Sequence, residues 1–412
     1  MKRLALAPLL VTALAGSVIL LTRLSTEASP DATITVDSTL DTNSRDDVVT
    51  LREAMMLATG DLSLDDLTSQ ECDQISGTYW GPLPGHCTST DPPGAASADT
   101  IVFETTVFPL GSREPIHLGD TLPTLDTDND TVDGSAAGVI VRGSGMPYFD
   151  CFRIISDYNT IKGLSITNCN TGVDILDGAQ NNTVGSTTAG EGNVIAFNAG
   201  DGVLVEGTGA TGNTICGNSI HSNTGLGIDL WSDGVTPNDP GDGDAGANNL
   251  QNFPVLALAT SGSTVIEGTL SSTPNIEFRL EFSANAACDL SGYGEGETFL
   301  GSATVVTDGT GNKDFQVSFP APVTVGQSIT ATATDPDNNT SEFSKCITVE
   351  AGPPGVGGIV ELQVGGSDSA VHSAADSLGG SSTSYHIALA AAAAAVVSLT
   401  AGAWYARRRW LG

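Results

Sequence analysis

One loosely repeated segment constrains the fold of this chain more than any other feature. The segment NTIKGLSITNCNTGVDI (Asn159 to Ile175) returns as NTICGNSIHSNTGLGIDL (Asn213 to Leu230), with the related fragments NTV and NVIAFNAGDGVLV between them. Short apolar triplets that recur every ~20 to 30 residues, separated by Asn or Gly, are typical of a parallel β-helix. Inward Ile, Leu and Val would form its continuous core, and Asn side chains can form ladders at its turns. The sequence therefore predicts an all-β chain with a parallel β-helix over residues 61–252.

A short helix is expected before the coils, within residues 31–60. After the strand-like segment ATITV comes TLREAM, in which Thr50 and Glu53 have the spacing of a capping box. An isolated helix this short is marginal, so its apolar stripe must pack on something. We predict that the stripe covers the open end of the first coil, and we interpret Arg52 as a surface residue. The stripe consists of Leu51, Ala54, Met55 and Ala58.

The charge of the chain excludes one class of function. The formal net charge is −33, and residues 31–384 hold nine Lys and Arg against 47 Asp and Glu. Such a surface repels nucleic acid and attracts cations. We therefore expect no nucleic-acid partner.

Both ends of the chain have the composition of membrane-directed segments. Residues 1–28 combine a basic start, an apolar run and small residues, which indicates a secretory signal peptide, with an uncleaved anchor as the alternative. Residues 385–406 form 22 residues without an acid or a strong base, followed by three Arg. This pattern predicts a transmembrane helix with a cytoplasmic basic tail, residues 407–412. Residues 351–384, rich in Gly, Ser and Ala, are interpreted as a flexible tether. We expect a protein exported to the cell envelope or surface, with its body outside.

A second β-region is expected at residues 253–350. About seven short strands with turn signals between them are the count of an immunoglobulin-like (Ig-like) sandwich. The segments are VLALAT, TVIEGTL, EFRLEFSA, TFLGSATVVT, KDFQVSF, SITATATD and FSKCITV. A stretch rich in Pro, Gly and Asp, residues 231–252, joins this region to the coils.

Seven cysteines in an exported chain predict disulfides with one thiol left over. For three of them, two alternatives stay open, a pair or buried apolar side chains: Cys151, Cys169 and Cys216. The preferred pairs are Cys72 with Cys87 and Cys288 with Cys346.

The chain resembles exported bacterial proteins that carry a CSLREA domain followed by right-handed, pectate-lyase-like β-helix repeats. The resemblance rests on VTLREAM after the ITV strand, on the NTIxGxxI repeats and on the junction LGIDL…DGVTPND…NNLQNFPVL. An Ig-like module ending ATATDPDNNTSEFS commonly follows in such chains. Val49 stands where the family motif usually has Cys. The resemblance implies a right-handed β-helix and an Ig-like module, and it implies no particular activity.

Carboxylates in the repeats are the candidate catalytic groups. Asp174, Asp201 and Asp229 each lie in or beside a strand, and His221 is close to Asp229 in sequence. Hydrolases need two or three converging carboxylates. The alternative is that these Asp cap turns or face solvent. A lyase would instead need a basic residue, for which the coils offer only Arg142, Arg153 and Lys162.

One loop has the composition of a calcium site. The segment NDPGDGDAGANN combines carboxylates and carboxamides with Gly, and hard oxygen ligands on a flexible loop suit Ca²⁺. The candidate ligands are Asp239, Asp242, Asp244 and Asn248, with Asn249 beside them. An acidic turn without metal is the alternative, and DPDNN (Asp335 to Asn339) is a second candidate.

These features predict a membrane-anchored surface protein. We expect a non-enzymatic role in adhesion, structural display or glycan binding, supported by Ca²⁺, with an extracellular glycan or cell-surface molecule as the partner. The alternative function is a polysaccharide-degrading hydrolase or lyase that uses the coil carboxylates.

Overall fold

The computed structural model describes residues 32–80, 87–89, 92–94, 98–112, 114–145, 149–262 and 264–352. All of these described residues belong to one unit. The expected signal peptide, nearly all of the tether, the transmembrane helix and the basic tail lie outside the described residues. Within the described part, no helix is both long and apolar enough to cross a bilayer.

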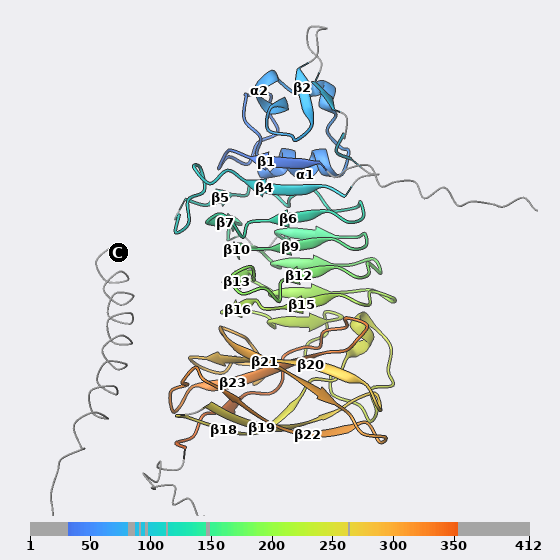
Figure 1. Cartoon of the computed structure of the whole chain (residues 1–412), viewed down its shortest axis with the longest axis vertical. Helices are drawn as coiled ribbons and strands as arrows, with labels where there is room; N and C mark the ends of the chain where they lie inside the picture. The colour runs from blue at the N-terminus through green and yellow to red at the C-terminus, as the bar shows by residue number, and fades with distance from the viewer. Residues whose placement is uncertain are drawn as a thin grey trace, which may run out of the picture. The chain divides into compact units, whose positions relative to one another are not determined.

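Three parallel sheets form a β-solenoid, which confirms the predicted parallel β-helix (Figure 1). The chain passes through the sheets in turn, so β6, β7 and β8 make one coil and the following strands make the next three complete coils. The first sheet contains β1 (Thr33–Val36), β4 (Thr100–Phe103), β6 (Thr131–Asp133), β9 (Thr160–Lys162), β12 (Thr183–Gly185) and β15 (Thr214–Cys216). The second contains β5 (Ile116–His117), β7 (Val139–Arg142), β10 (Leu164–Thr167), β13 (Val194–Ala196) and β16 (Ser219–His221). The third contains β8 (Phe152–Ile154), β11 (Val173–Ile175), β14 (Val203–Val205) and β17 (Ile228–Leu230).

Buried polar ladders run alongside the apolar core of the solenoid. In the longest ladder, each backbone N–H donates to the side-chain oxygen of the corresponding residue in the next coil, at 2.7 to 3.0 Å. All six members have no exposed surface. A buried N–H without a partner is costly. The ladder therefore stabilises turns whose N–H donors would otherwise have no acceptor. Its members are Asp99, Asp130, Asn159, Asn182, Asn213 and Asn248.

The N-terminal end of the solenoid is covered as the sequence predicts. Helix α1 (Leu51–Ala58) begins at Thr50, which forms the full capping box with Glu53. The apolar stripe of α1 is fully buried in the same core cluster as the coil interior, and α1 contacts β1 and β4. Arg52 is ion-paired with Asp41 and donates to two carbonyls of the first coil region. The helix therefore closes the first coil.

The prediction began the β-helix at residue 61, but the described residues of this segment, 61–80 and 87–89, contribute no strand to the three parallel sheets. They contain η1 (Leu64–Asp66), α2 (Ser69–Cys72) and the antiparallel pair β2 (Thr78–Trp80) and β3 (Cys87–Ser89). Ile75 forms an antiparallel bridge with Ile34 of β1. This segment therefore covers the outer edge of β1.

The second β-region consists of two antiparallel sheets, and its strands match the seven predicted segments. One sheet contains β18 (Val255–Thr260), β19 (Thr264–Ser271) and β22 (Asn312–Phe319). The other contains β20 (Glu277–Asn285), β21 (Thr298–Val306), β23 (Ser328–Thr334) and β24 (Ile347–Thr348). The sheets pack through one apolar core, in which Phe282 contacts Phe315 and Phe319.

Side chains of the second β-region satisfy the free backbone edge of the last coil. Glu295 accepts from the N–H of Asn223 at 3.0 Å and from its side-chain amide at 2.9 Å. Glu281 accepts from Gly217, and Glu342 accepts from Leu230 at 3.1 Å. An open solenoid edge exposes unpaired N–H groups, so these three carboxylates terminate the stack. Burial raises the pKa of Glu342 to about 7, since its bonds from Thr236 and Leu230 offset only part of the desolvation.

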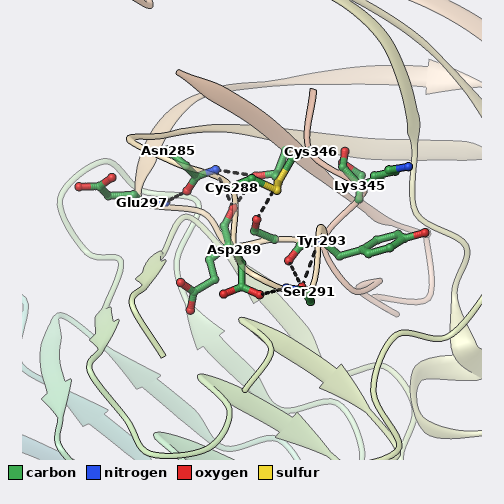
Figure 2. The surroundings of a disulfide bond; sticks show 12 residues. Asn285, Cys288, Asp289, Ser291, Tyr293, Glu297, Lys345 and Cys346 are labelled. Carbon is green, nitrogen blue, oxygen red and sulfur yellow. Dashed lines mark hydrogen bonds between the residues drawn. A yellow bond between two sulfur atoms is a disulfide. The ribbon is translucent and has the colours of Figure 1, made fainter. Parts of the chain in front are cut away.

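The preferred disulfides Cys72–Cys87 and Cys288–Cys346 are present, with Cα–Cα distances of 5.7 and 5.9 Å. Cys151 pairs with Cys169, which resolves the open alternative, and Cys216 is a buried free thiol. Burial raises the pKa of that thiol to about 12. Figure 2 shows how Cys288–Cys346 fastens the loop that contains Asp289, Ser291 and Tyr293. Because Glu295 follows in the same loop, this disulfide also restrains the closure of the last coil.

Candidate ligand-binding groove

A row of six threonines runs across the outer face of the first sheet. Strand register places each Thr opposite the next one along the sheet. Neighbouring members are therefore about 4.8 Å apart, the spacing of paired strands. All six are half-buried, and no hydrogen bond joins their hydroxyls to another described residue. The row is Thr33, Thr100, Thr131, Thr160, Thr183 and Thr214.

The local sequence explains this row. In five coils, Thr stands between an Asn or Asp and an Ile or Val, as in Asn159-Thr160-Ile161. Successive side chains of a strand point to opposite faces. The first residue of each triplet therefore points inward and joins the polar ladder, and the third points inward into the apolar core. The Thr between them faces outward. Sequence reasoning recognised the triplets but missed the row, although the repeated Thr was the signal that could have revealed it.

A charged triad lies beside the row, with Asp133 and Lys162 at the next outward strand positions and Glu191 in the loop between β12 and β13. Lys162 Nζ lies 3.1 Å from Asp133 Oδ2 and 2.9 Å from Glu191 Oε2. Burial opposes the charge of Lys162, but the hydrogen bonds to Glu191 and Asp133 outweigh it and raise the pKa of the amine. For Asp133, burial is likewise outweighed by bonds from Ser135 and Lys162, which lower the pKa of the carboxyl. Lys162 is therefore held charged, which does not suit a catalytic base.

Five members of the row, together with Asp133 and Lys162 of the triad, line a shallow groove of about 600 Å³. Its surface is dominated by hydroxyl groups, with one cation and one carboxylate in the middle. The lining residues are Thr100, Thr131, Asp133, Thr160, Lys162, Thr183, Gly185, Ser186, Thr187, Thr214 and Cys216. Such a surface can donate and accept hydrogen bonds along a line that crosses five strands.

The three candidate catalytic carboxylates lie at the third sheet. Asp174 and Asp229 occupy the same register two coils apart, with Leu204 between them. They are only 5% and 4% exposed. Burial and the charge of Asp150 raise the pKa of Asp174 to about 7, while Arg153 opposes the shift. Burial and the charge of Asp201 raise the pKa of Asp229 to about 6.

These carboxylates bind backbone or neighbouring side chains. Asp229 accepts from the N–H groups of Ser232 at 3.1 Å and Gly234 at 3.2 Å, and Asp201 accepts from Leu226 at 2.6 Å. His221 lies on the second sheet, edge to face with Phe197. The sequence placed His221 near Asp229, but the coil turn separates them onto different sheets. The arrangement is that of turn-stabilising groups.

The predicted metal ligands are brought together only in part. Asp239, Asp242 and Asp244 each offer an oxygen, and these oxygens lie within 4.8 Å of one another. The side chain of Asn248 is instead the last member of the long ladder, where it bonds Asn213 and Thr340. Asn249 lies beside it at positive φ and is exposed.

The second candidate, DPDNN, forms a turn in which Asp335 accepts from both nitrogens of Asn339 at 2.8 Å. Asn339 in turn accepts from the N–H of Gly212 at 2.7 Å. This turn therefore belongs to the closure of the last coil.

Comparison of the sequence with models of known protein families gives no match, and comparison with curated proteins gives none either.

Proposed function

We propose that this chain is a surface-displayed protein that binds an extended glycan in the groove of the first sheet without cleaving it. The observation that carries the proposal is the row of threonine hydroxyls that bond no other described residue, repeated at strand spacing along a groove of about 600 Å³. A linear polysaccharide presents hydroxyl groups at regular intervals, so it can exchange bonds with several members of the row at once.

The charges favour a neutral or amino-bearing glycan over a polyanion. The net charge of −33 repels anionic chains, and the one cation in the groove is already neutralised by two carboxylates. Asp133 and Glu191 can accept from sugar hydroxyls or amines, and Lys162 can donate.

The architecture supports a display role. We propose that the chain is related to the CSLREA-domain proteins, that its solenoid is right-handed and that its second β-region is an Ig-like module. We further propose that a signal peptide exports the body and that residues 385–406 anchor it in the membrane. The groove would then face the exterior of the cell.

Calcium is a second element of the proposal. Three carboxylates with oxygens within 4.8 Å fit the hard-oxygen preference of Ca²⁺, which takes six to eight such ligands. Asp242 already accepts from Asn252, Gln251 and Ser272, so Asp239 and Asp244 have more free capacity. When bound, Ca²⁺ would offset two of the three negative charges of these carboxylates.

A glycan panel on the full-length protein tests the proposal, with binding and turnover measured in the presence of Ca²⁺ and of a chelator. We expect saturable binding without turnover. Thr131→Val together with Thr160→Val should weaken binding about fivefold or more, because each lost hydrogen bond contributes roughly 0.5–1.5 kcal/mol. The variant keeps β-branched side chains, so the strands should persist.

The matched control is Thr304→Val, which removes an exposed hydroxyl on β21 of the second β-region. Equal binding by the groove variant and the control would show that the glycan does not bind in the groove. Turnover that Asp229→Asn abolishes would instead establish the enzymatic alternative. A melting temperature that does not change when Ca²⁺ is added would contradict the proposed calcium site.

A further inference from the structure

A separate cavity lies where the last coil leads into the second β-region. It has a volume of about 260 Å³ and is lined by Trp231, Asp233, Val235, Thr236, Pro237, Ala245 and Leu250. Trp231 is 41% exposed although it is a large aromatic side chain. An aromatic side chain and a carboxylate thus line one cavity in a chain whose aromatic content is 5%.

Buried polar groups hold the cavity walls in place. Trp231 and Ser232 both have positive φ, 96° and 61°, a conformation that costs energy for non-glycine residues. Trp231 N–H donates to the Val205 carbonyl at 2.9 Å, and Asp229 accepts from Ser232 at 3.1 Å. Asp229 therefore holds the strained turn in place through its bond from Ser232. This carboxylate has a positioning role.

The opposite wall is also anchored. Glu342 accepts from the N–H of Thr236 at 2.9 Å and from its hydroxyl at 3.2 Å. Leu250 follows Asn248, whose amide donates to Asn213 and Thr340 at 2.7 and 3.0 Å. The cavity is therefore built in advance of any ligand, which lowers the entropic cost of binding.

The charged residues in the sequence segment that lines the cavity have one sign. Between Lys162 and Arg279 the sequence contains 12 Asp and Glu and neither Lys nor Arg. Asp233 lines the cavity, and Asp239, Asp242 and Asp244 lie on the loop that supplies Ala245. An organic cation gains from the carboxylates and from contact with the indole, since Trp is the aromatic residue that binds cations best.

We propose that this cavity binds an organic ammonium group through Trp231 and Asp233. The volume suits a single small group, and the apolar residues Val235, Pro237 and Leu250 favour an ammonium that carries carbon substituents over a hydrated metal ion. The site is separate from the groove of the first sheet, so it does not rest on the proposed function.

Calorimetric titration of the full-length protein with choline tests this inference, with 3,3-dimethylbutan-1-ol as the neutral molecule of the same shape. Ethanolamine distinguishes a primary from a quaternary ammonium. We expect choline to bind at least about fivefold more tightly than the neutral alcohol, the range that a cation–π contact supports. Trp231→Leu should weaken choline binding by about tenfold or more and Asp233→Asn by about threefold or more.

Trp231→Phe keeps an aromatic wall and should retain part of the affinity, which guards against misfolding of the leucine variant. Asp314→Asn removes an equal charge from an exposed position of β22 and should leave binding unchanged. The groove variant Thr131→Val/Thr160→Val should also bind choline normally. Any of three results would overturn the inference. These are equal affinity for choline and the neutral alcohol, preference for a neutral sugar, and no saturable binding of choline.

Discussion

At the scale of single residues, the buried ladder predicts a large effect from a small substitution. Asn182 accepts from the N–H of Asn159 at 2.7 Å and donates to the Ser156 carbonyl at 3.0 Å, with no exposed surface. Asn182→Ala leaves both partners buried without a bond, which should lower the free energy of unfolding by about 2–4 kcal/mol. Urea denaturation measures this change in the free energy of unfolding. Asn43→Ala, at an exposed position outside the ladder, should stay within about 0.5 kcal/mol. Equal effects of the two would mean that water replaces the missing bonds.

At the scale of elements, α1 is predicted to act as the closure of the first coil. Leu51 is fully buried in the core that α1 shares with the coils. Leu51→Asp places a charge there, and any gain from an acid at a helix N-terminus is smaller than the burial cost. We expect a loss of about 3–5 kcal/mol together with binding of an apolar dye. Leu40→Asp, at a leucine that is 53% exposed, is the matched control. Unchanged melting of the Leu51 variant would disprove the closure.

Elements with a local pattern could be predicted from the sequence, and the polar contacts that close the last coil could not. The capping box of Thr50 and Glu53, the coil triplets and the strands of the second β-region depend on spacing within a few residues. Asn248 was assigned to a metal loop because its ladder partner Asn213 is 35 residues away, across a segment without periodicity. Glu295 and Glu342 reach the last coil over 72 and 112 residues. No local rule specifies such pairs, since tertiary packing decides them.

At the scale of the whole molecule, buried acids predict that mild acid stabilises the protein. Burial raises the pKa of Asp130, Asp174 and Glu342 to about 7 and that of Asp229 to about 6. The folded protein therefore keeps protons that the unfolded chain, with carboxyl pKa values near about 4, has released. By linkage, the free energy of unfolding falls as the pH rises from about 4 to about 7, and the net charge of −33 acts in the same direction. The ion-paired Asp133 opposes this trend only at lower pH, because its pKa is lowered.

Thermal melting between pH 5 and pH 8 tests this prediction at constant ionic strength. We expect a melting temperature several degrees higher near pH 5.5 than at pH 8. Asp174→Asn should flatten the profile, because the Oδ1 atom of this buried carboxylate has no hydrogen-bond partner in the described part of the chain and its charge is costly at high pH. Asp314→Asn, at an exposed position, should leave the profile as it is. A melting temperature that falls steadily from pH 8 to pH 5.5 would show that ion pairs and hydrogen-bonded carboxylates, and not the desolvated acids, dominate the stability of the fold.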